Sequence, residues 1–180
     1  MADEVLPGRA CGSCTLCCKI LEIEELAKPQ GQWCSNCKTG SGCLIYESRP
    51  QTCRAFNCGY LVWPLAGEHW LPSRSKMVIL SELDGARVAI HVDPGRPGAW
   101  REQPYYADIK RWAVQFAQSQ MQVVVTIGRR VFVILPHEDV DLGEVADDER
   151  IITQQRKAPD GSLILNAVKM KADDPRLAGN

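Results

Sequence analysis

Residues 11–18 read CGSCTLCC, which places four cysteines in eight positions with the last two adjacent. Five more cysteines follow in WCSNCKTGSGC (33–43) and TCRAFNC (52–58), so all nine lie between positions 11 and 58. Thiols at this density serve as disulfide staples, redox couples or metal ligands. The rest of the chain has no cysteine, so this chemistry belongs to one N-terminal module.

The composition is that of a globular protein: 45% of the 180 residues are hydrophobic and 24% are charged. A net charge of −1, with six basic and six acidic side chains in residues 1–60, gives no footprint for nucleic acid or an anionic membrane. Residues 1–10 lack the apolar run of a secretory signal, and no stretch is apolar for long enough to span a bilayer. We therefore expect a cytoplasmic protein, where reduced cysteines disfavour the disulfide staple.

Four segments follow from this pattern. They are a cysteine-cluster metal-binding module of loops and short helices (1–62), a Pro/Gly/Trp-rich connector (63–75), an α+β unit (76–170) and a flexible polar tail (171–180). The predicted fold class is α+β: a cysteine-rich, metal-stabilised N-terminal module, then an antiparallel β-sheet covered by one main helix.

Six strands and one helix are expected in the α+β unit. The strands form three hairpins, with turns at Asp84–Gly85, at Gly128 and in APDG (158–161). The helix is expected over 104–119, because its large apolar residues recur every three or four positions, at Tyr105, Ile109, Trp112 and Phe116.

The cysteine spacing is C-x2-C-x2-C-C, then C-x2-C-x5-C, then C-x4-C. Paired C-x2-C turns are typical of thiolate metal sites, because the turn brings both sulfurs to one ion. All nine cysteines are therefore candidate ligands: Cys11, Cys14, Cys17, Cys18, Cys34, Cys37, Cys43, Cys53 and Cys58. Arg54, Arg49 and Tyr46 lie among them and are candidates for supporting contacts that offset the thiolate charge.

Zinc ions and an iron–sulfur cluster both accept four cysteines. Cys11, Cys14 and Cys17 match the first three positions of a ferredoxin-type run, but Cys18 breaks that run, which favours zinc for a structural role. Adjacent side chains are expected to point apart. Cys17 and Cys18 would then serve different ions, or one of them would be a spare thiol.

The motifs CGSCTLCC (11–18) and GCLIYESRPQTCRAFNC (42–58) resemble the YkgJ-like cysteine-cluster family, described as a zinc- or iron-chelating domain. The resemblance covers about residues 11–60 and implies metal or cluster binding by the cysteines, without a settled reaction. Some larger relatives attach this motif to protein-modifying enzymes that contain an iron–sulfur cluster. The C-terminal two-thirds carries no such motif.

Other polar residues are weaker candidates. His91 and Asp93 share a strand face, and H-x-D can bind metals, but a structural histidine is commoner. His69 is expected in an aromatic interface and His137 in a loop, and the acidic run 138–149 is expected to be a solvated loop.

The function expected is binding of zinc or iron by a cytoplasmic cysteine-cluster protein. One alternative is an iron–sulfur or open-site metal enzyme or redox protein, and another is a metal chaperone or thiol redox sensor. The α+β unit would then offer a surface to a protein partner. No nucleic-acid or membrane partner is expected.

Overall fold

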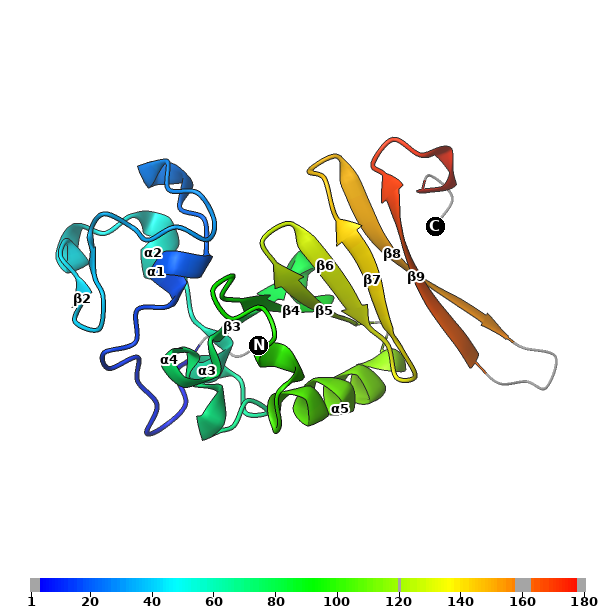
Figure 1. The fold of residues 1–180 in the computed structure, drawn as a ribbon, viewed down its shortest axis with the longest axis horizontal. Coiled ribbons are helices and arrows are strands. Elements are labelled where there is room, and N and C mark those ends of the chain that lie inside the picture. The colour runs from blue at the N-terminus through cyan, green and yellow to red at the C-terminus, as the bar shows by residue number, and fades with distance from the viewer. Residues whose placement is uncertain (1–3, 120, 158–162, 178–180) are drawn as a thin grey trace.

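The computed structural model describes residues 4–119, 121–157 and 163–177. Figure 1 shows the cysteine-rich module at one end of the molecule, a five-stranded sheet in the middle and a long two-stranded hairpin at the other end. Helices and sheets are mixed, which confirms the α+β class. None of the helices in these ranges has the length and apolar character that a bilayer crossing requires.

The cysteine-rich module contains only short elements, as expected. They are α1 (Cys17–Ile20), η1 (Glu24–Leu26), β1 (Cys37–Lys38), β2 (Gly42–Cys43), η2 (Tyr46–Ser48), α2 (Gln51–Ala55) and α3 (Gly59–Val62), where η marks a 3-10 helix. The connector forms η3 (Glu68–Trp70) and α4 (Pro72–Ser75). Helices of one turn present little apolar surface, so this module has little core of its own.

The central sheet has the order β3-β4-β5-β6-β7. Its strands are β3 (Met77–Glu82), β4 (Arg87–Val92), β5 (Gln122–Ile127), β6 (Arg130–Ile134) and β7 (Asp139–Glu144), with η4 (Leu83–Gly85) turning the first hairpin. The predicted hairpins β3–β4 and β5–β6 are confirmed. The expectation of a wholly antiparallel sheet is wrong at one pair, because β4 and β5 run parallel. The connection between them carries η5 (Ala99–Arg101) and α5 (Tyr105–Ala117), and a parallel pair needs such a crossover.

The acidic segment 138–149 is the second correction. It was expected to be a solvated loop, but β7 lies within it and pairs with β6. Val140 and Leu142 pack partly buried against an apolar cluster on the sheet, which explains why this segment is ordered as a strand.

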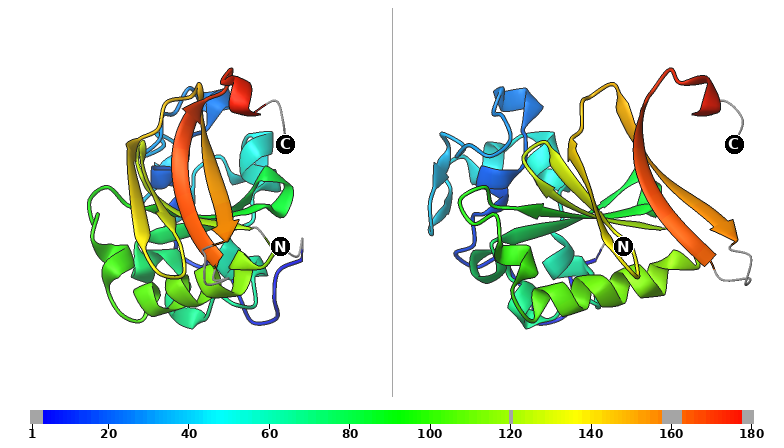
Figure 2. Two further views of the ribbon diagram at one scale, coloured as in Figure 1. Left: turned by 90° about the vertical axis from the view of Figure 1, so that its right-hand side faces the viewer. Right: turned by 45° about the vertical axis from the view of Figure 1, so that its right-hand side comes forward.

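The third predicted hairpin forms a separate two-stranded sheet. Its strands β8 (Glu149–Lys157) and β9 (Leu163–Lys171) pair along their full length, and η6 (Pro175–Leu177) follows. The expected APDG turn at 158–161 lies outside the described residues. Figure 2 shows this hairpin standing beside the central sheet, and Ala167 from β9 packs into the apolar cluster on the sheet face away from α5.

The expected helix is confirmed as α5, and its stripe is buried. Ile109 and Trp112 are almost fully inaccessible, and they pack in the main core together with residues of the sheet. Trp112 also stacks with two tryptophans of the connector, at ring-centroid distances of 4.5 Å to Trp63 and 4.9 Å to Trp70. The connector is therefore part of the core, and it joins the cysteine-rich module to the sheet.

The module itself docks on β3 through α3. Gly59 begins this helix, and a Cβ atom added there would lie 2.7 Å from the Cβ of Ile79. Only glycine permits this close approach. The adjacent Cys58 is consequently buried at the boundary between the module and the sheet.

Candidate metal centre

The nine cysteines gather around two cavities that share part of their walls. All nine lie in the described part of the chain, and none is in a disulfide. The larger cavity, of about 420 Å³, is lined by eight of them: Cys11, Cys14, Cys17, Cys18, Cys34, Cys37, Cys43 and Cys53. The smaller cavity, of about 120 Å³, is lined by Cys58 together with Cys11, Cys14, Cys17 and Cys53. Every predicted ligand thus faces a cavity.

Two C-x2-C turns are closed by the same backbone hydrogen bond. The N–H of Cys14 donates to the carbonyl of Cys11 at 2.9 Å, and the N–H of Cys37 donates to the carbonyl of Cys34 at 3.0 Å. A bond from the N–H of Cys34 to the carbonyl of Cys18, also 3.0 Å, ties the second turn to α1. Cysteines from separate motifs therefore line one cavity.

Cys18 lies at the centre of the thiol contacts. A hydrogen bond with Cys17 raises the pKa of Cys18, and burial and the charge of Cys17 act in the same direction. Cys17 and Cys18 both line the larger cavity. Burial and the charge of Cys18 also raise the pKa of Cys37, to about 11.

Lys28 is a cation beside these thiols. It is buried, since only 6% of the surface of the residue is exposed. Its ammonium donates to the carbonyl of Lys19 at 2.8 Å and to the carbonyl of Leu21. Burial lowers the pKa of Lys28, while the charges of Cys18, Cys34, Cys17 and Cys53 oppose that shift. Within the described ranges it forms no ion pair with a carboxylate.

Arg49 faces both cavities. Its guanidinium lies over the ring of Tyr46, 3.9 Å from the centroid, and its buried Nε has no hydrogen-bond partner within the described structure. Arg54, the third candidate for a supporting contact, is exposed and lines neither cavity. Arg49 and Tyr46 therefore lie at the wall of a thiol cavity, and Arg54 does not.

The donor set fits a thiolate-ligated metal, but the thiols do not converge. Among the His, Cys, Asp and Glu side chains of the described ranges, no three are arranged as ligands of one ion. Zinc bound at about 2.3 Å from each sulfur would need neighbouring thiols about 3.8 Å apart. The chemistry of the site therefore suits zinc or an iron–sulfur cluster, and loading would draw the thiols inward.

The histidines belong to other parts of the molecule. His91 contacts Glu82 at 3.1 Å and Thr126 at 2.9 Å, while Asp93 pairs with a lysine, so the H-x-D pattern forms no joint site. His69 contacts Asp108 at 2.7 Å within the aromatic interface expected for it. His137 is exposed.

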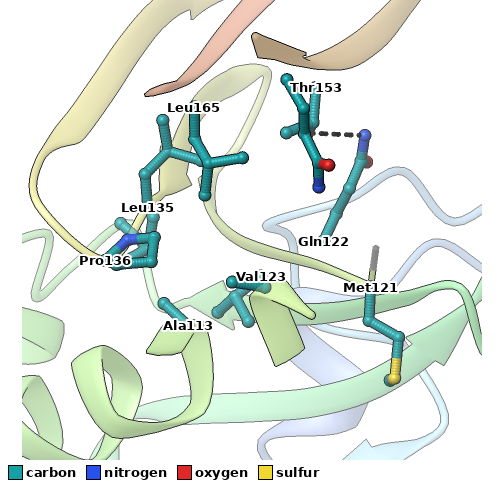
Figure 3. A pocket seen from close by; sticks show the side chains of 11 residues that line it. Ala113, Met121, Gln122, Val123, Leu135, Pro136, Thr153 and Leu165 are labelled. Atoms are coloured by element: carbon teal, nitrogen blue, oxygen red, sulfur yellow. Dashed lines mark hydrogen bonds between the residues drawn. The ribbon is translucent and has the colours of Figure 1, made fainter. Parts of the chain in front are cut away.

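A further hollow, of about 410 Å³, lies where the β8–β9 hairpin meets the sheet and the end of α5 (Figure 3). Gln122 joins the two parts by donating to Thr153 at 3.1 Å, drawn as a dashed line, and to the carbonyl of Ile151 at 3.2 Å. Ala113 and Leu165 are among its other lining residues, and none of the described side chains lining it is charged. It therefore offers space for a neutral group but no acid, base or metal ligand.

Lys28 is the residue of this site that sequence reasoning missed. It is ten positions after Cys18 and six before Cys34, so it stands outside every cysteine motif. The chain reverses through a bridge between Ile23 and Lys28, which returns the lysine to the thiols. No local pattern in the sequence signals that return.

No protein-family model matches the chain, and no curated protein or solved structure matches it either. What can be argued about function therefore rests on the residues and their arrangement.

Proposed function

We propose that this chain binds metal through its N-terminal cysteines, as zinc ions or as an iron–sulfur cluster. The observation that carries the proposal is the cavity of about 420 Å³ lined by eight cysteines drawn from three separate sequence motifs. Thiols scattered over the surface would not share one cavity. Thiolate sulfur is the ligand that zinc and iron–sulfur clusters prefer.

The side chains around the cavity support the same proposal. Four thiolates on one divalent zinc would carry a net charge of −2, which the buried ammonium of Lys28 and the half-buried Arg49 at the cavity wall would offset. Leu21, Phe56 and Leu80 contribute apolar wall, which would limit the access of water to a bound group. Zinc would supply a rigid cross-link for a module with little core, and a cluster would supply electron transfer.

Elemental analysis of anaerobically purified protein tests this proposal directly. We expect zinc or iron in stoichiometric amount, and loss of the metal on chelation should change the circular-dichroism spectrum and lower the melting temperature. A protein that binds neither metal, even after incubation with Zn²⁺ or reconstitution with iron and sulfide, would refute the proposal.

A redox role for an iron–sulfur cluster is a second candidate, favoured by the size of the cavity. One water molecule occupies about 30 Å³ of liquid, so 420 Å³ exceeds what a single ion needs. Brown, air-sensitive protein with iron and acid-labile sulfide would support this role. Colourless protein with stoichiometric zinc would argue against it.

A further inference from the structure

We propose that Lys28 is the built-in counter-cation of the thiolate centre and makes the fold of the module depend on metal. This inference rests on the proposed function, since it concerns the same site. Its basis is that Lys28 is buried, with 6% of its surface exposed. The hydrogen bonds of its ammonium go to two uncharged groups, the carbonyls of Lys19 and Leu21.

Burying a charge costs several kcal/mol of desolvation, which an opposite charge nearby helps to offset. No carboxylate in the described ranges pairs with Lys28. Its electrostatic neighbours are the thiols of Cys18, Cys34, Cys17 and Cys53. Among the described residues, the groups that act on the charge of Lys28 are therefore candidate metal ligands, and the two carbonyls that it contacts follow Cys18 by one and three residues.

These thiols gain negative charge when they bind metal. Each Cys–SH releases its proton to solvent and forms a metal–sulfur bond, and the centre becomes anionic as a whole. An anionic centre then balances the positive charge of Lys28 in the metal-loaded protein, and this balance is missing in the metal-free protein. The lysine should stabilise the first state and not the second.

A purely structural reading is also available for Lys28. Its two acceptors lie at and just beyond the C-terminal end of α1, where a cation satisfies free carbonyls whatever the thiols do. That role would contribute equally with and without metal. The two readings therefore differ in how the effect of a substitution depends on loading.

The test compares Lys28→Met with the full wild-type chain, using Co²⁺ as a spectroscopic probe of thiolate sites. Lys38→Met is the matched control, because Lys38 is an exposed lysine in the same module, next to Cys37. We expect Lys28→Met to weaken Co²⁺ binding by about tenfold or more, the scale of other supporting contacts to metal ligands. The melting temperature of the metal-free variant should not fall, and Lys38→Met should change neither quantity.

Co²⁺ affinity within twofold of wild type, or an equal fall in melting temperature with and without metal, would overturn the inference in favour of the structural reading. Lys28→Gln, which keeps a donor for the carbonyls but has no charge, gives the same decision if Lys28→Met does not fold. A wild-type chain that binds no Co²⁺, zinc or iron would instead refute the proposed function, before any variant is compared.

Discussion

The ammonium of Lys19 forms an ion pair of 2.6 Å with the carboxylate of Asp93, and this pair links α1, which carries Cys17 and Cys18, to the end of β4. Both side chains are largely buried, with 21% and 10% of their surfaces exposed. The same Asp93 oxygen accepts the N–H of Gly95 at 2.8 Å, which fixes its orientation. This contact therefore ties the helix that carries two of the thiols to the sheet.

We expect Lys19→Met to lower the free energy of unfolding by about 1–2 kcal/mol, because it leaves a partly buried carboxylate without its cation. Denaturant titration of the metal-loaded chain measures the loss. Lys19→Arg, which keeps the charge, should retain part of the stability. An unfolding midpoint unchanged in Lys19→Met would show that the pair does not hold the module on the sheet.

Gly59 gives a second test of how the module is seated. The Cβ atom of an alanine there would lie 2.7 Å from the Cβ of Ile79 and 3.0 Å from its carbonyl oxygen, so α3 must move away from β3. We expect Gly59→Ala to destabilise the protein by about 1–3 kcal/mol, the usual range for overpacking. Gly98→Ala is the control, because no heavy atom lies within 4 Å of its added Cβ and its φ is −88°. Equal melting temperatures for the two variants would contradict this account of the docking.

The parts of the fold that can be predicted are those that depend on a pattern of neighbouring residues in the sequence. The stripe of α5 and the turn at Gly128 can be recognised within a few residues, and both are present. The parallel pairing of β4 with β5 depends on where α5 packs, which no short window contains. β7 was missed because Val140 and Leu142 are its only apolar side chains among acidic neighbours.

The candidate site also contains residues that the sequence predicts and one that it does not. The spacing of the cysteines marks them as candidate ligands, and in the structure all nine line the two cavities. Arg49 was found because it lies in a cysteine motif, whereas Lys28 reaches the thiols through a chain reversal. Candidate ligands can thus be predicted from the sequence, whereas nearby charges can be predicted only when they are neighbours of the cysteines in the chain.

Asp108 predicts how stability depends on pH. Burial alone would raise the pKa of its carboxyl, but hydrogen bonds from Trp70 and His69 and the charge of Arg111 outweigh burial and lower the pKa below its usual value. A carboxyl with a depressed folded-state pKa stabilises the protein above its unfolded pKa of about 4, and this stability is lost as pH falls through the folded-state value.

Asp108→Asn should therefore cost about 1–3 kcal/mol at neutral pH and flatten the fall of stability in acid. Denaturant titrations of the metal-free chain at a series of pH values measure both effects. Asp84→Asn is the control, since Asp84 is exposed in the β3–β4 turn. A variant whose stability falls in acid as steeply as that of wild type would contradict a role for the Asp108 carboxylate.

Arg49 should tune metal binding through the geometry of its guanidinium as well as its charge. The guanidinium stacks on Tyr46 at 3.9 Å, Arg49 lies at the wall of both thiol cavities, and its buried Nε has no hydrogen-bond partner among the described residues. A thiolate of a metal-loaded centre would supply an acceptor for this N–H, so we expect Arg49→Met to weaken zinc binding by about 10–100-fold, as removal of supporting contacts does elsewhere. Arg49→Lys should not restore it, because an ammonium can neither stack in the same way nor present Nε.

Competition with a chelator measures these affinities, and Arg54→Met, which alters an exposed arginine of the same motif, should leave them unchanged. Full rescue by lysine would show that charge alone matters at this position.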